Sequence, residues 1–173
     1  MQPSSYDELN ELCRTIQTSF VHLETRDSYG TEVELPRMAK WRRGEPDDFE
    51  WLQWWLELLR EHRRAGRICR RARIVSEPLS DYQQWTLSHA RLFADAGEEI
   101  RYAPRPLLVE IPLPGSGDFY VFDNKTVLYL HYAGSGMNAH FERSDDPKLV
   151  EFCRESFEAV WTIAPPLSEY KPQ

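Results

Sequence analysis

The stretch Gly117–Tyr132, GDFYVFDNKTVLYLHY, consists of two apolar runs separated by the polar residues of a turn. In the first run apolar side chains occupy both alternating sets of positions, Phe119 and Val121 in one set and Tyr120 and Phe122 in the other. Because successive strand residues point to opposite faces, such a hairpin belongs inside a sheet that is covered on both sides. The stretch therefore predicts a central β-hairpin within a layered fold.

The turn of this hairpin decides which side chains meet across it. With Asn124-Lys125 at the turn, Asp118 lies opposite His131. A carboxylate that orients an imidazole can serve base catalysis. A slip of one residue in the register destroys the pair, and no recognisable nucleophile motif accompanies it. We therefore favour a structural hairpin, with a catalytic dyad as the alternative.

Hydrophobic periodicity predicts the elements around the hairpin. Helices are expected over residues 5–20, 47–65, 80–96 and from 146 to about 164. Strands are expected over residues 21–27, 31–35, 67–75, 98–103 and 139–143, with a loop over 36–48 and an extended edge segment over 104–114. The strand, helix and strand within 67–103 indicate parallel neighbours joined by a crossover. We predict a mixed α/β fold in one domain, 1–173, with one central mixed sheet of about six or seven strands covered by about four helices.

Composition limits the classes of function. The formal charge is −7 and 41% of the residues are hydrophobic, but no apolar run approaches the roughly 20 residues that a membrane helix needs. The N-terminal MQPSSYDELNELC does not resemble a signal peptide. Cys13, Cys69 and Cys153 are odd in number and far apart, so we expect reduced cysteines and a cytoplasmic protein. The five histidines show no metal-ligand spacing along the chain, so we expect no metal and no cofactor.

The segment Arg60–Arg73 contains seven arginines in fourteen residues. Arginine makes forked contacts with carboxylates and phosphates, so the segment could bind an acidic partner, or it could be a solvated face balanced by nearby acids. The preceding helix is apolar on more than one face, which leaves open an exposed Trp54 or a homodimer contact. The overall acidity and the lack of a recognition element argue against direct nucleic-acid binding. The residues predicted to bind a partner are Trp54, Arg63, Arg64, Arg67, Arg70 and Arg71.

Polar residues near the predicted strand ends suggest a second site. In open α/β sheets ligands bind at the carboxyl ends of the strands, and a parallel arrangement would bring Arg26 and Arg101 to one edge. The alternative is a solvated strand end with an internal ion pair. The residues predicted to line a ligand pocket are Glu24, Arg26, Glu77, Tyr82, Trp85 and Arg101.

Four phrases occur in one order along the chain: LETRDSYG (23–30), RARIVSEPLSDYQQW (71–85), AGEEIRYAPR (96–105) and DFYVFDNKTVLYLHY (118–132). Together they resemble an uncharacterised actinobacterial family, domain of unknown function six-eight-seven-nine, over nearly the whole chain. Members of that family are often found near helix-turn-helix regulators, so the resemblance implies a regulatory or partner role.

The order of AGEEIRYAP and the hairpin also looks like the second part of a phospholipase-D-like unit. Catalytic members of that superfamily carry His-x-Lys, whereas His131-Tyr132-Ala133 and His140-Phe141-Glu142 lack the lysine. This likeness implies a ligand-sensing or protein-binding module without phosphodiesterase chemistry. We therefore expect a non-enzymatic accessory protein that binds a protein partner, such as a helix-turn-helix regulator, or a small ligand. The alternative is an enzyme that acts on a small polar or phosphorylated substrate at the charged pocket.

Overall fold

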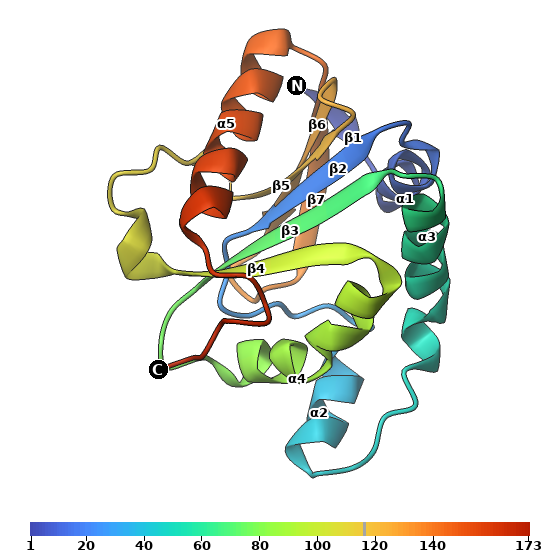
Figure 1. Ribbon diagram of the computed structural model, residues 1–173, viewed down its shortest axis with the longest axis vertical. Helices are drawn as coiled ribbons and strands as arrows, with labels where there is room; N and C mark the ends of the chain where they lie inside the picture. Colours follow the sequence, from blue (N-terminus) through green and yellow to red (C-terminus); the bar gives the residue numbers. More distant parts are fainter. Residues whose placement is uncertain (116) are drawn as a thin grey trace.

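The predicted hairpin is formed by β5 and β6 and lies inside a sheet whose strand order is β1-β7-β6-β5-β2-β3-β4 (Figure 1). The computed structural model describes residues 1–115 and 117–173. The seven strands of this described part are β1 (Gln2–Ser4), β2 (Ser19–Glu24), β3 (Ile68–Val75), β4 (Glu98–Pro104), β5 (Asp118–Phe122), β6 (Thr126–Tyr132) and β7 (Asn138–Ser144). Strands β2, β3 and β4 are parallel, and the other neighbours are antiparallel. The predicted mixed sheet and its number of strands are confirmed.

Helices cover both faces of the sheet. The described residues contain five α-helices rather than about four: α1 (Tyr6–Thr15), α2 (Leu35–Arg42), α3 (Gln53–Arg64), α4 (Asp81–Ala96) and α5 (Pro147–Ile163). Two 3₁₀ segments are η1 (Glu50–Leu52) and η2 (Arg105–Leu108). Helix α5 packs on the face that carries Val21, Ile74 and Phe119, while α1 and α3 pack on the face that carries Phe20 and Tyr120. Figure 1 shows α5 on one side of the sheet and α1, α3 and α4 on the other.

Local signals placed the ends of α4 and α5 correctly. Ser80 caps α4 by accepting a hydrogen bond from the N–H of Gln83, and Gly97 with φ 122° ends it. Asp146 caps α5, whose first residue is Pro147. Strands β3 and β4 on either side of α4 are parallel neighbours, as the strand–helix–strand pattern predicted.

Several expected segments differ from the structure. Helix α1 begins after Ser5 as predicted but ends at Thr15, and Phe20 lies in β2. The strand expected at 31–35 is instead a turn over residues 32–34 that leads into α2, and α2 replaces much of the loop expected at 36–48. The first turn of α2 contains Pro36, a residue suited to that position. The proline-rich segment 104–114 forms η2 and loop instead of an edge strand, and β4 is the last strand on that side.

The hairpin register differs by one residue from the predicted one. Val121 pairs with Val127, and Asp118 lies opposite Leu130. The turn centres on Asp123 and Asn124, which have φ values of 50° and 55°. Asp and Asn tolerate this left-handed conformation better than most residues, which favours them over Lys125 at the turn.

The shift separates the two polar residues of the predicted pair. The side chain of Asp118 shares a face with the buried Tyr120, on the side of α1 and α3. His131 shares a face with Tyr129, on the side of α5. The Asp118–His131 dyad, which was the alternative to a structural hairpin, is therefore not formed in the described structure.

Candidate functional site

A buried ion network crosses the three parallel strands on the side of α3 and α4. Glu24 of β2 lies 2.6 Å from Arg71 Nη1 and 2.9 Å from Arg73 Nη1, both on β3. Arg71 Nε donates to Glu98 of β4 over 3.0 Å. All four side chains are buried. Two arginines and two carboxylates thus meet inside the protein and tie β2, β3 and β4 together.

Within this network the buried arginines and carboxylates stabilise one another's charges. Burial raises the pKa of Glu98, against the influence of Arg71. Burial alone would lower the pKa of Arg71, but the carboxylates of Glu98 and Glu24 hold it well above its usual range. Beside them His22 stacks on Tyr120 at 3.8 Å between ring centroids, and burial lowers its pKa, so His22 is neutral at pH 7. Glu24, predicted to contact a ligand, instead neutralises internal charge.

Three more predicted ligand residues lie among aromatic rings on the same face of the sheet. The guanidinium of Arg26 lies over the Tyr132 ring, 5.5 Å from its centroid. Tyr82 donates a hydrogen bond of 2.9 Å to Glu34. Trp85 is buried within the aromatic layer under α2. These side chains hold α2 and α4 against the sheet.

The last two predicted ligand residues lie elsewhere. Glu77 accepts a hydrogen bond of 2.8 Å from the hydroxyl of Tyr170. Arg101 donates to the carbonyls of Trp161 and Ala164 and stacks over the Trp161 ring at 4.5 Å, which places it on the α5 face. Arg101 therefore does not join Glu24 and Arg26, which lie on the other face of the sheet.

A different polar cluster occupies the carboxyl ends of the parallel strands. Asp27 accepts from the backbone N–H of Ser76 over 2.6 Å and from its hydroxyl over 2.7 Å. Arg105 Nη2 lies 3.3 Å from Asp27 and donates to the carbonyl of Thr25 over 3.0 Å. We had not predicted Ser76 or Arg105, although each directly follows a strand. Their mutual hydrogen bonds join the three strand ends.

Asp118 is a buried carboxylate near this edge. It accepts hydrogen bonds from the N–H of Thr25 over 2.8 Å, from the Thr25 hydroxyl over 2.7 Å and from the hydroxyl of Tyr29. Burial raises the pKa of Asp118 to about 6, although these hydrogen bonds act in the opposite direction. Asp118 anchors the segment that follows β2.

The predicted partner-binding arginines divide into buried and exposed groups. Arg71 is enclosed in the ion network, and Arg70 points to the other face, where it pairs with Glu158 of α5 over 3.1 Å. Arg67 Nη1 lies 3.3 Å from the buried His62. Alternation along β3 thus directs consecutive arginines to opposite faces.

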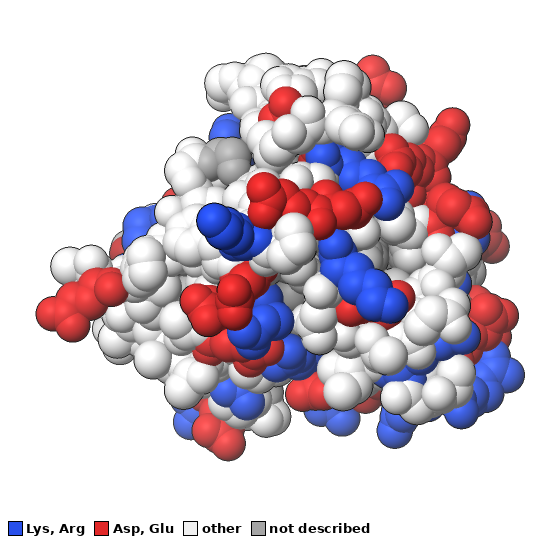
Figure 2. Space-filling view, turned by 90° about the horizontal axis from the view of Figure 1, so that it is seen from above, with Lys and Arg blue, Asp and Glu red and all other residues white. Residues whose placement is uncertain are grey.

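The exposed predicted arginines, Arg63 and Arg64, lie at the end of α3, beside Arg60. Arg60, Arg63 and Arg64 line a shallow cleft of about 400 Å³, together with Glu57, Asp95 and Ala96. Glu57 pairs with Arg60 at 3.2 Å and with Arg64 at 3.0 Å, and both pairs are solvent-exposed. Trp54, with 47% of its surface exposed, lies earlier on the same helix. Figure 2 shows the molecule from above, with acidic and basic side chains interspersed on that face.

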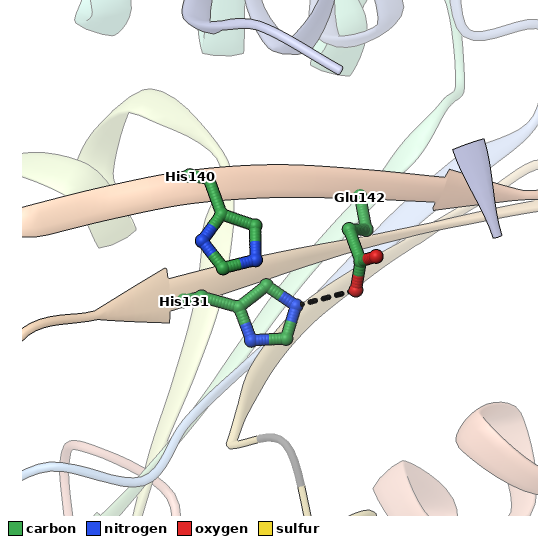
Figure 3. A group of neighbouring side chains, drawn as sticks. All are labelled: His131, His140 and Glu142. Atoms are coloured by element: carbon green, nitrogen blue, oxygen red, sulfur yellow. Dashed lines mark hydrogen bonds and ion pairs between the residues drawn. The ribbon is translucent and has the colours of Figure 1, made fainter. Parts of the chain in front are cut away.

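Strands β6 and β7 bring three possible metal ligands together toward the β1 edge of the sheet. His131, His140 and Glu142 offer donor atoms that all lie within 4.8 Å of one another (Figure 3). The interpretation of histidine spacing along the chain missed this group, because His131 meets the other two only across the strand pair. The available signal was the spacing of His140 and Glu142, which are two positions apart on a strand and therefore share a face.

Comparisons with known proteins place the chain in a family without assigning an activity. Within the described residues, no helix has the length and apolarity needed to cross a membrane. No curated protein matches the chain. The family model described as Domain of unknown function (DUF6879) matches residues 7–172, nearly the whole sequence. The chain therefore belongs to the DUF6879 family.

Proposed function

We propose that this chain is a binding protein whose exposed α3 surface docks an acidic surface of a protein partner. The observation that carries the proposal is the cleft between α3 and the end of α4, lined by Arg60, Arg63 and Arg64. Solvent-exposed ion pairs contribute about 0–1 kcal/mol, so Glu57 can release Arg60 and Arg64 to partner carboxylates at little cost.

Trp54 adds an aromatic anchor to this α3 surface. It is the half-exposed tryptophan of α3, while the adjacent Trp55 is buried. Tryptophan and arginine are enriched among the residues that dominate binding energy at protein interfaces. A helix-turn-helix regulator with an acidic surface is the partner class that we propose to test first.

The experiment uses affinity capture from lysate of the source organism, followed by reconstitution with the purified captured protein. Wild type is compared with Arg63→Glu/Arg64→Glu and with Trp54→Ala. The matched control is Arg42→Glu/Arg43→Glu, which reverses two exposed charges at the C-terminal end of α2. Circular dichroism and thermal unfolding verify that every variant is folded.

The proposal expects reconstituted binding that weakens at least about tenfold in the α3 variants, persists in the control and falls with added salt. Equal binding by the α3 variants and the control would refute it. In parallel, thermal-shift measurements with nucleotides and phosphorylated metabolites test the alternative of a small ligand. In one outcome, a ligand raises the unfolding temperature of the wild type but not that of Arg105→Ala. If the α3 variants also changed no binding, the binding site would lie at the strand ends.

A further inference from the structure

We infer that His131, His140 and Glu142 form a binding site for a divalent first-row transition metal, of which Zn²⁺ is the representative. The three donor groups come from two adjacent antiparallel strands, and His131 of β6 lies directly opposite His140 of β7. His140 and Glu142 are two residues apart on one strand and therefore share a face. Figure 3 shows the three side chains pointing toward one another from the two strands.

The present contacts bring the three donor groups close together. His131 Nε2 lies 2.9 Å from Glu142 Oε2. The rings of His131 and His140 are stacked, with centroids 4.3 Å apart and an interplanar angle of 15°. Ligand atoms around a tetrahedral zinc ion, with bonds of about 2.0 Å, lie about 3.3 Å apart. The donors lie within 4.8 Å of one another, and rotation of the stacked rings about their side-chain torsions would direct them into a coordination sphere.

The chemistry of the donors selects the class of metal. Two imidazoles and one carboxylate suit zinc and other first-row transition metals, whereas calcium and magnesium prefer oxygen ligands alone. Metal binding through Nε2 of a neutral His131 would replace the hydrogen bond to Glu142 and leave the imidazole proton on Nδ1. Three protein ligands leave one tetrahedral position for water or for a donor atom of another molecule. His140 is exposed, so this fourth position is accessible from solvent.

The inference is independent of the proposed partner surface, because the ligands lie on β6 and β7 and the arginines lie on α3. The test starts from chelator-treated full-length protein. Zn²⁺ binding is measured by calorimetry, and Co²⁺ binding by its visible absorption. Wild type is compared with His140→Gln and Glu142→Gln, and Glu11→Gln removes an exposed carboxylate of α1 as the control.

We expect one Zn²⁺ per chain in the wild type and in the control, with a Co²⁺ spectrum typical of tetrahedral coordination. Loss of an outer-shell partner typically lowers metal affinity 10–100-fold, so loss of a direct ligand should lower it at least about tenfold. Equal affinity in wild type and His140→Gln, or no measurable binding by the wild type, would overturn the inference. Unfolding temperatures measured without metal verify that the variants are folded. If Glu142→Gln is not folded, His131→Asn replaces it as the second ligand variant.

Discussion

The N–H of Gly30 donates a hydrogen bond to the carbonyl of Gly136, with 2.9 Å between nitrogen and oxygen. This contact joins the segment after β2 to the turn between β6 and β7. Tyr29, next to Gly30, packs edge-on against Tyr132 and donates to Asp118. The two glycines therefore allow the close backbone approach that positions the buried aromatic and carboxylate groups at this edge.

Gly136→Ala should destabilise the protein by about 1–3 kcal/mol. Gly136 has φ 85°, and a Cβ atom there would lie 2.9 Å from the backbone nitrogen of Gly30. Gly134→Ala is the matched control in the same turn, because a Cβ atom at Gly134 meets nothing within 4 Å. Urea denaturation measures both variants, and equal free energies of unfolding would contradict the interpretation.

Arg71→Met should destabilise the protein by about 3–5 kcal/mol, because it leaves Glu98 buried without its partner. Adding Glu98→Gln should recover part of the loss, since Glu24 still pairs with Arg73. Arg91→Met is the control on α4, where Arg91 and Asp95 form an exposed pair and the change should be within about 1 kcal/mol. Denaturant unfolding of the wild type and the three variants measures the loss and its partial recovery, and a double variant less stable than Arg71→Met would contradict this account.

The ionisation of Asp118 should lower stability as the pH rises. Burial raises the pKa of this group from 3.8 to about 6, so the folded chain holds the proton more tightly than the unfolded chain. The resulting stabilisation is complete below about pH 4 and is lost as the pH rises through about 6. A shift of this size corresponds to a change on the order of 3 kcal/mol.

Asp118→Asn isolates this effect, because the amide stays neutral at every pH. Buried His22 and His89 also have lowered pKa values, which make the stability fall as the pH drops below about 6.5, but the two proteins share them. Subtraction therefore removes the histidine contribution. Between pH 4 and pH 7 the wild type should lose stability relative to Asp118→Asn in urea denaturation. A constant difference would show that Asp118 titrates normally.

The sequence predicted those parts of the fold that depend on neighbouring residues. Ser80 and Gly97 mark the two ends of α4 through contacts within a few positions. The hairpin is apolar on both faces, which required a sheet covered on both sides. The helix at Leu35–Arg42 was missed because Pro36 and Gly44 suggest a loop, although proline is compatible with the first turn of a helix.

The site was harder to predict because it depends on register and on long-range packing. Alternation along β3 could have shown that Arg70 and Arg71 point to opposite faces, but not that Glu24 and Glu98 would surround Arg71. The grouping of His131 with His140 and Glu142 likewise depends on the pairing of β6 with β7. The carboxylate of Asp123 helps to set the hairpin register, and its most distant partner, Gln17, lies 106 residues away along the chain.

Asp123 accepts hydrogen bonds from the N–H groups of Gln17, Thr18 and Ser19, at distances of 2.7–3.0 Å. It also accepts from the Thr18 hydroxyl at 3.0 Å. These contacts attach the hairpin turn to the chain between α1 and β2, where the helix ends earlier than its periodicity suggests. Burial acts to raise the pKa of Asp123, but the backbone hydrogen bonds outweigh it and lower the pKa.

Asp123→Ala should therefore destabilise the protein by about 2–3 kcal/mol, since it removes charged hydrogen bonds and places alanine at φ 50°. Asp123→Asn should have a smaller effect, because asparagine tolerates this conformation and keeps one acceptor oxygen. Asp123→Gly relieves the backbone strain but keeps none of the hydrogen bonds, so it separates the two contributions. Urea denaturation at pH 7 ranks the three variants. If glycine restored full stability, backbone conformation alone would account for Asp123, and its link to residues 17–19 would have no part in holding the hairpin register.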